Sequence, residues 1–239
     1  MGRSKQDSVE GGTCKRVLQI IKKKMYAHPQ CIIDCVMITS AIDAYERRDV
    51  MTIDCPGAFL RALASDPVLM RLRGPLVEAL VLIDPALYRE YITTDKKGEP
   101  ILYVRMNKAL YGLLKSSLDF YNKLRGDLEE KGFKINPYNP CVANKMVNGK
   151  QMTVIWHVDD LKVSHVDPKE NTKFADWMKG IYGEKLTIHR GKIHDYLGMD
   201  MDWSKDGQVS ISMIKYLIKM LDDFIENITK SSITPARDR

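Results

Sequence analysis

The sequence has no apolar run long enough to cross a membrane, no signal peptide at its start, no internal repeat and no low-complexity segment. Its five cysteines are an odd number and lack the paired spacing of a zinc site. We therefore expect reduced thiols in an intracellular protein, with neither disulfides nor zinc and with no membrane partner. The apolar and charged fractions are those of an ordinary soluble globular protein.

Positive charge is scarce outside the first 24 residues. The 239-residue chain has a formal net charge of +6, and seven basic against two acidic side chains give residues 1–24 a local charge of +5. We expect residues 1–30 to form a basic arm, either one that contacts nucleic acid or a disordered solvating tail. The rest of the chain is close to neutral, so its affinity for nucleic acid must come from local patches.

Two adjacent acids, Asp159 and Asp160, separate two short apolar runs. Successive side chains of a strand point to opposite faces, so neighbouring carboxylates serve one metal centre only if the chain reverses between the runs. Asp is also simply a common turn residue. A third acid, Asp54, ends a predicted strand over 49–53, directly before Pro56 and Gly57. Three carboxylates at two strand ends favour a site for two divalent cations and in-line phosphoryl transfer.

Periodicity and turn signals predict an α/β (α+β) fold with an antiparallel sheet and packed helices. Helices are predicted over 31–48, 107–130, 168–182 and 213–228, and hairpins around Asn148-Gly149, at the aspartate pair and over 197–211. Residues 61–106 read as irregular strands and loops. On the helix predicted over 107–130, one stripe aligns Lys108, Tyr111, Gly112, Lys115 and Asp119.

Five segments in order carry a resemblance: Ile42–Val50, Asp54–Leu60, Asn107–Leu113, His157–Leu161 and Asp195–Met199. Over residues 33–224 the chain resembles the reverse transcriptase domain of copia-type LTR retrotransposons, in particular the branch found in diatoms. The resemblance implies a polymerase palm over 31–212 with partial fingers at 61–106, followed by a thumb-like helix and tail over 213–239.

The same resemblance implies roles for individual residues. Asp54, Asp159 and Asp160 would be catalytic and would bind two Mg²⁺, with Mn²⁺ as a substitute. The residues implied for nucleotide binding are Cys55, Gly57, Ala58, Phe59 and Lys115, and those implied for primer and template are Gly112, His157, Tyr196, Leu197 and Gly198. Phe59 matches an aromatic gate that excludes the ribose 2′-hydroxyl, while core packing is the alternative reading of the same ring. His157 stands where many relatives have Tyr.

The implied function is that of a nucleotidyltransferase, an RNA-directed DNA polymerase that extends a primer 3′-hydroxyl. Its partners would be an RNA or DNA template with its primer, deoxynucleoside triphosphates and the rest of a polyprotein with integrase and RNase H. It would work in cytoplasmic virus-like particles or in the nucleus. The basic fingers strands of the family are not recognisable in residues 1–30. A decayed copy that only binds nucleic acid, or is inert, is therefore the alternative. A palm-like nucleotide cyclase is a weaker third reading.

Overall fold

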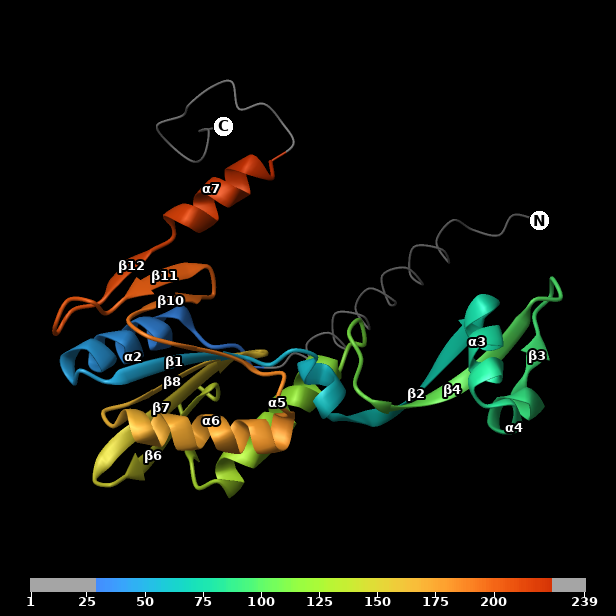
Figure 1. Cartoon of the computed structure of the whole chain (residues 1–239), viewed down its shortest axis with the longest axis horizontal. Coiled ribbons are helices and arrows are strands. Elements are labelled where there is room, and N and C mark those ends of the chain that lie inside the picture. The colour runs from blue at the N-terminus through green and yellow to red at the C-terminus, as the bar shows by residue number, and fades with distance from the viewer. Residues whose placement is uncertain (1–28, 225–239) are drawn as a thin grey trace, which may run out of the picture.

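The computed structural model describes residues 29–224, so nearly all of the expected basic arm lies outside the described residues. Its centre is a six-stranded sheet in the order β5-β6-β7-β8-β1-β9 (Figure 1). The strands are β1 (Asp49–Asp54), β5 (Lys134–Ile135), β6 (Val142–Val147), β7 (Lys150–His157), β8 (Asp160–His165) and β9 (Thr187–Arg190). Every neighbouring pair is antiparallel, and the predicted α/β class is confirmed.

Helices and a second sheet cover the two faces of the central sheet. One face packs against α5 (Ser116–Glu130) and α6 (Pro168–Tyr182), and the other against α2 (Ile33–Tyr45) and the small sheet β10 (Ile193–Tyr196), β11 (Met199–Asp202) and β12 (Ser210–Ser212). Met51 and Ile53 lie in the core with α5 and α6, whereas Val50 lies in the core with α2 and β11. Because side chains alternate along a strand, Asp54 falls on the α2 face of β1.

The hairpin predicted from Asn148-Gly149 is confirmed. These two residues have φ of 51° and 74°, as in a type I′ turn, and Val147 pairs with Lys150 across them. The predicted hairpin of β11 and β12 is present as well. Turn chemistry in the sequence therefore sets the register of much of the sheet.

The structure corrects the packed face of the first helix, which the spacing of the apolar residues predicts to hold Ile32, Ile33, Val36, Met37, Ala41 and Ile42. α2 is shorter than predicted and buries Val36, Thr39, Ser40, Asp43 and Ala44, while the apolar Ile33 and Met37 remain exposed. The prediction was wrong because Asp43 is buried in an ion pair with Lys162, which hydrophobic periodicity does not detect.

The sequence predicts irregular strands and loops for residues 61–106. In the structure they form a long ribbon that stands away from the central sheet (Figure 1). After η1 (Ala58–Arg61), its elements are β2 (Leu63–Arg73), α3 (Pro75–Ile83), α4 (Pro85–Tyr88), η2 (Arg89–Tyr91), β3 (Thr93–Thr94) and β4 (Pro100–Lys108). β2 and β4 pair antiparallel, with a register shift between Leu63 and Val68. Half-buried and exposed residues alternate from Val68 to Arg73 on β2, but Pro67 interrupts the strand before them, which hides its full length in the sequence.

The helix predicted over 107–130 begins only at Ser116. Lys108 still belongs to β4, and in the connecting segment Gly112 has a φ of 91°, in the left-handed region. A residue in that region lies outside helical geometry, so the predicted helical stripe from Lys108 to Asp119 does not form.

The last two helices differ in how well they were predicted. α6 has its predicted ends, because the Asp167 side chain accepts a hydrogen bond from the Lys169 N–H at 2.9 Å and Gly183 follows with a φ of 91°. α7 (Ile214–Asp222) is shorter than predicted, and residues 225–228 lie outside the described part.

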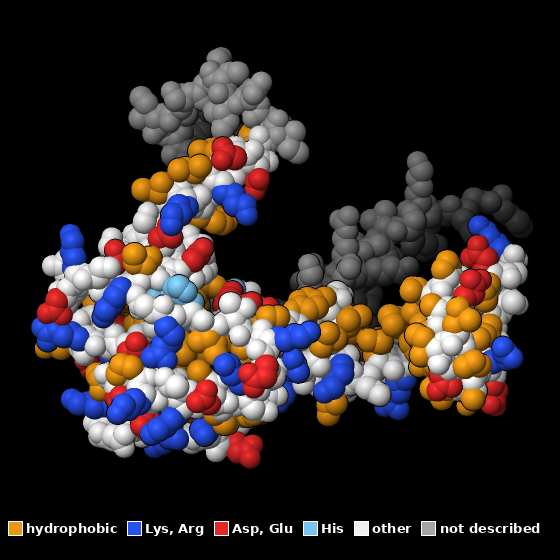
Figure 2. Space-filling model, viewed as in Figure 1, with side chains coloured by type: hydrophobic (Ala, Val, Ile, Leu, Met, Phe, Trp, Pro, Cys, Tyr) orange, Lys and Arg blue, Asp and Glu red, His pale blue; other side chains and the backbone are white. Residues whose placement is uncertain are grey.

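Apolar side chains are exposed on α7 and at the ribbon tip (Figure 2), among them Leu217 and Leu82. Each helix within residues 29–224 is too short or too polar to span a lipid bilayer.

Candidate active site

Three aspartates lie at one end of the central sheet. β1 and β8 pair so that Asp54 is directly opposite Asp160. The chain reverses at Val158, which has a φ of 58°, and this leaves Asp159 in the turn before β8. The backbone N–H of Cys55 donates to the carbonyl oxygen of Asp159 at 3.2 Å, which attaches the turn to the end of β1. The structure thus brings together the three acids selected from the sequence.

These acids repel one another, and within the described part of the chain only the charge of His157 lowers the pKa of Asp159 and Asp160 through space. Burial raises the pKa of the Asp159 and Asp160 carboxyls, and the charge of Asp54 raises both further. Among residues 29–224, none of the three forms an ion pair. In the same part of the chain, no group of three or more His, Cys, Asp or Glu side chains is placed to hold a metal ion. The acids are electrostatically coupled but do not form a complete ligand set in this conformation.

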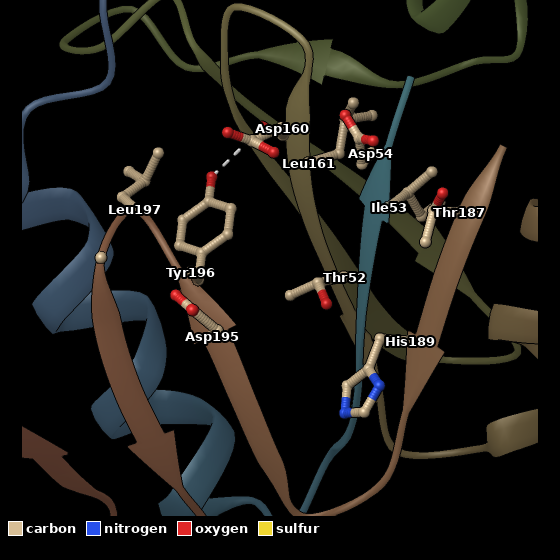
Figure 3. A pocket seen from close by; sticks show the side chains of 11 residues that line it. Thr52, Ile53, Asp54, Asp160, Leu161, Thr187, His189, Asp195, Tyr196 and Leu197 are labelled. Carbon is tan, nitrogen blue, oxygen red and sulfur yellow. Dashed lines mark hydrogen bonds between the residues drawn. The ribbon is translucent and has the colours of Figure 1, made fainter. Parts of the chain in front are cut away.

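A cavity of about 490 Å³ opens beside Asp54 and Asp160 (Figure 3). Its opposite wall is the turn between β10 and β11, where Leu197 and Gly198 have φ of 54° and 75°. The hydroxyl of Tyr196 donates to the backbone carbonyl oxygen of Asp160 at 3.4 Å. Three of the five residues implied for primer and template, Tyr196, Leu197 and Gly198, therefore line the same cavity as Asp54 and Asp160.

Four polar residues of this cavity were not selected from the sequence: Thr52 on β1, Thr187 and His189 on β9, and Asp195 on β10. His189 is held by its Nε2 atom, which lies 2.8 Å from the carbonyl oxygen of Ile193. The sequence signal for β9 is weak, since a four-residue strand shows too little alternation to be recognised.

His157 ends β7 directly opposite Asp160 and is half-buried. Its Nδ1 atom is buried and has no hydrogen-bond partner within the described residues. A buried ring nitrogen in this state is an available polar contact for a molecule bound beside the acids.

The segment after Asp54 places the predicted nucleotide-binding residues in two environments. The side chains of Cys55 and Ala58 are fully buried, and burial raises the pKa of the Cys55 thiol to about 11. The Cys55 carbonyl oxygen accepts the N–H of Ala58 at 3.0 Å. Only the backbone of these two residues is left to contact a ligand. Gly57, with a φ of 68°, turns the chain into η1, which carries Phe59.

Phe59 is half-buried between two other rings. Its ring centroid lies 4.4 Å from that of Tyr111 and 6.4 Å from that of Phe120. The ring therefore packs on the core along one side, as one reading of the sequence expected, and borders the region of the acids through Tyr111. Tyr111 was placed on a helix by the sequence analysis and was not selected as a site residue.

Gly112 and Lys115 do not line the cavity beside Asp54. They line a separate cavity of about 400 Å³ at the base of the ribbon, together with Asp66 and Asp119. Nζ of Lys115 lies 3.1 Å from the Asp66 carboxylate, and the hydroxyl of Ser65 donates to Asp119 at 2.6 Å. These contacts attach the base of β2 to the start of α5.

Comparison with known proteins gives a family match over most of the chain. A family model described as reverse transcriptase (RNA-dependent DNA polymerase) matches residues 19–237. Among solved structures, telomerase from Candida tropicalis in complex with a TWJ fragment of telomeric RNA is similar at 14% identity and a TM-score of 0.43, over 82% of this chain and 36% of that one. The telomerase from Candida albicans, also with a TWJ fragment, is similar at 12% identity and a TM-score of 0.37, over 86% of this chain and 41% of that one. The chain spans less than half of the length of these telomerases.

Proposed function

The chain belongs to the reverse transcriptase (RNA-dependent DNA polymerase) family, and we propose that it adds deoxynucleotides to a primer 3′-hydroxyl along an RNA template. The observation that carries this proposal is the pairing of Asp54 with Asp160 across β1 and β8, with Asp159 in the adjoining turn. Carboxylates gathered at the ends of two neighbouring strands suit phosphoryl transfer assisted by divalent cations.

The donor set favours two Mg²⁺ ions, with Mn²⁺ as a substitute, because both cations prefer carboxylate oxygens. Asp54, Asp159 and Asp160 would hold them, and the raised pKa values of Asp159 and Asp160 support this, since bound cations relieve the repulsion among the carboxylates. When bound, such ions activate the attacking oxygen and neutralise charge on the leaving group. The carboxylates must first move closer, because the described residues contain no complete ligand set.

The primer end is assigned to the cavity beside the acids. The turn formed by Leu197 and Gly198 would hold the primer strand. The hydrogen bond from the Tyr196 hydroxyl to the Asp160 carbonyl oxygen fixes the position of this turn relative to Asp160. His157 would add a polar contact through its unpartnered Nδ1 atom. These residues orient the primer; they move no proton in this proposal.

The incoming deoxynucleotide is assigned to the opposite side of the acids, along η1. There the backbone of Gly57 and its neighbours would line the triphosphate pocket, and the Phe59 ring would exclude a 2′-hydroxyl. Lys115 would reach the nucleotide only after its ion pair with Asp66 opens. Gly112, in the same cavity as Lys115, would contact the template strand.

The chain is further assigned to a copia-type retrotransposon of the diatom branch, on the five sequence segments that carry the resemblance. Its partners would then be an RNA or DNA template with a primer, deoxynucleoside triphosphates, and integrase and RNase H of the same polyprotein. Residues 31–212 would be the palm, with fingers at 61–106 and a thumb-like part from residue 213. Virus-like particles in the cytoplasm, or the nucleus, would be its place of action.

A second candidate is a decayed copy that only binds nucleic acid or is inert. The observation that favours it is the lack, within residues 29–224, of a side-chain group placed to hold a metal ion. Family membership is equally consistent with either candidate, so the reaction itself must be measured.

Primer extension with purified chain, a homopolymeric RNA template, a DNA primer and Mg²⁺ separates the candidates. We expect deoxynucleotide addition that stops on chelation and returns with Mg²⁺ or Mn²⁺. Binding of the primer–template without extension at any metal concentration would support the decayed copy. A folded chain that neither binds nor extends the primer–template would support an inert copy and contradict the polymerase.

A further inference from the structure

Tyr111 lies in a connecting segment whose backbone is fixed on both sides. Before it, the N–H of Ala109 donates to the carbonyl oxygen of Ala62 at 3.1 Å. Next to it, the buried hydroxyl of Ser116 donates to the Leu110 carbonyl at 2.6 Å and accepts from the Leu110 N–H at 3.1 Å. The backbone at Tyr111 is therefore held in one place, although its side chain is 53% exposed.

The Tyr111 ring is the exposed end of a row of four rings. Tyr111 meets Phe59 at 4.4 Å between ring centroids, Phe59 meets Phe120 at 6.4 Å, and Phe120 meets Tyr182 at 6.0 Å. Phe120 and Tyr182 are buried in the core with α5 and α6. Phe59 is thus held between a fixed core ring and Tyr111, and rotation of its side chain breaks contact with one of them.

This row ends beside the acids. Burial raises the pKa of the Tyr111 phenol, and the charges of Asp159 and Asp54 raise it further. The phenol is therefore near enough to these carboxylates to sense their charge. Phe59 belongs to η1, along which the nucleotide is assigned, and Tyr111 contacts Phe59 there, while neither ring lines the cavity assigned to the primer.

We propose that Tyr111 is a specificity-determining positioning residue, which holds the Phe59 ring in place so that this ring rejects nucleotides with a 2′-hydroxyl. The inference rests on the proposed polymerase function. A wall distinguishes two sugars by one hydroxyl only if it does not move aside when the larger sugar enters. In this chain Tyr111 supplies that restraint from the exposed side, where the core supplies none.

The test is a double-variant cycle on sugar choice. The ratio of kcat/KM for a deoxynucleotide to that for the matching ribonucleotide is measured for wild type, Tyr111→Leu, Phe59→Val and the double variant. We expect Tyr111→Leu to lower the ratio roughly tenfold, the lower end of what one small group contributes in a pocket, mainly by improving ribonucleotide use. Because Tyr111 acts through Phe59, the double variant is expected to match Phe59→Val alone.

Two further variants separate positioning from a general loss of structure. Tyr111→Phe keeps the ring and is expected to keep the ratio. Tyr138→Leu removes a tyrosine that is 91% exposed and lies outside the row of four rings, and it is also expected to keep the ratio. Thermal unfolding of each variant checks its fold, and Tyr111→Met replaces Tyr111→Leu if the latter does not fold.

The possible outcomes distinguish the role of Tyr111 from the polymerase function itself. An unchanged ratio in the folded Tyr111→Leu or Tyr111→Met variant overturns the inference about Tyr111 while leaving the polymerase function standing. Additive losses in the double variant also overturn it, because Tyr111 would then act on the nucleotide independently of Phe59. No nucleotide addition by the wild type overturns the polymerase function, and the role of Tyr111 with it.

Discussion

Lys162 and Asp43 form an ion pair beneath the central sheet that joins β8 to α2. Lys162 lies two residues after Asp160 on the same strand, so both side chains are on the α2 face. Arg48 lies 3.8 Å from the other carboxylate oxygen of Asp43, and the exposed fraction of each of the three side chains is 2% or less. The strand that begins with an active-site acid is thus attached to its supporting helix by buried charges.

Removing Lys162 is expected to destabilise the fold strongly, because it leaves the buried Asp43 carboxylate with only the more distant Arg48, at 3.8 Å, to compensate its charge. Lys162→Met should lower the free energy of unfolding by about 3–5 kcal/mol, measured by urea denaturation. Lys150→Met, at an exposed lysine on β7, is the matched control and should change little. A loss for Lys162→Met as small as that of the control would show that the pair contributes nothing to stability.

Asp159→Asn is expected to reduce primer extension by at least about a hundredfold, because one less carboxylate weakens cation binding and leaves developing phosphate charge uncompensated. The fold should persist, since the side chain lies in a turn and forms no ion pair within residues 29–224. Asp176→Asn, at an exposed position on α6, is the control. Circular dichroism and extension rates together check this, and substantial extension by folded Asp159→Asn would rule out the metal assignment.

The raised pKa of Asp160 determines whether the folding stability of the metal-free protein rises or falls with pH. Burial is its main cause, followed by the charges of Asp159 and Asp54. Between the ordinary value of 3.8 and the raised value, the folded chain binds a proton that the unfolded chain has released, so stability falls as the pH rises through this window. The charged carboxylate therefore opposes folding at neutral pH, and this penalty disappears as the pH falls.

Asp160→Asn is accordingly expected to raise the Tm at pH 7 in the presence of a chelator. The gain should vanish once the pH is below about 4, where the unfolded carboxyl is protonated too. Because Asp160 is half-exposed, solvent screening keeps the gain modest. Calorimetry across this pH range measures it, and a variant less stable than wild type at pH 7 would contradict the sign.

Deleting residues 1–24 removes a local charge of +5 and leaves a body close to neutral. We expect the shortened chain to bind primer–template more weakly and with a shallower dependence on salt, because fewer counterions are released on binding. Fluorescence anisotropy over a salt series measures both quantities. The same affinity and the same slope would assign nucleic-acid binding to the remaining surface.

The part of the fold that the sequence predicted is the part encoded by neighbouring residues. The hairpins at Asn148-Gly149 and at the aspartate pair follow from turn chemistry, and the ends of α6 follow from Asp167 and Gly183. Because Asp54 and Asp160 sit at strand ends fixed by these signals, their meeting was predictable before their partners in the sheet were known.

The predictions that were wrong concern features set by contacts between residues far apart in the sequence. Apolar spacing gave the wrong face for α2, because Asp43 is buried by charges on other elements. The leucines around Gly112 have a helical spacing, yet the backbone there is held by Ser116 in a turn. β9 is defined by its pairing with β1, and that contact leaves no signal in four residues.

The hydrogen bond between Ala109 and Ala62 is the last rung that ties the two strands of the ribbon together at its stem. Phe59 lies three residues before this rung and Tyr111 two residues after it. The two rings that contact each other therefore follow directly on the two strands of the ribbon. Any displacement of the ribbon relative to the central sheet would reach the Phe59–Tyr111 contact before any other part of the proposed nucleotide site.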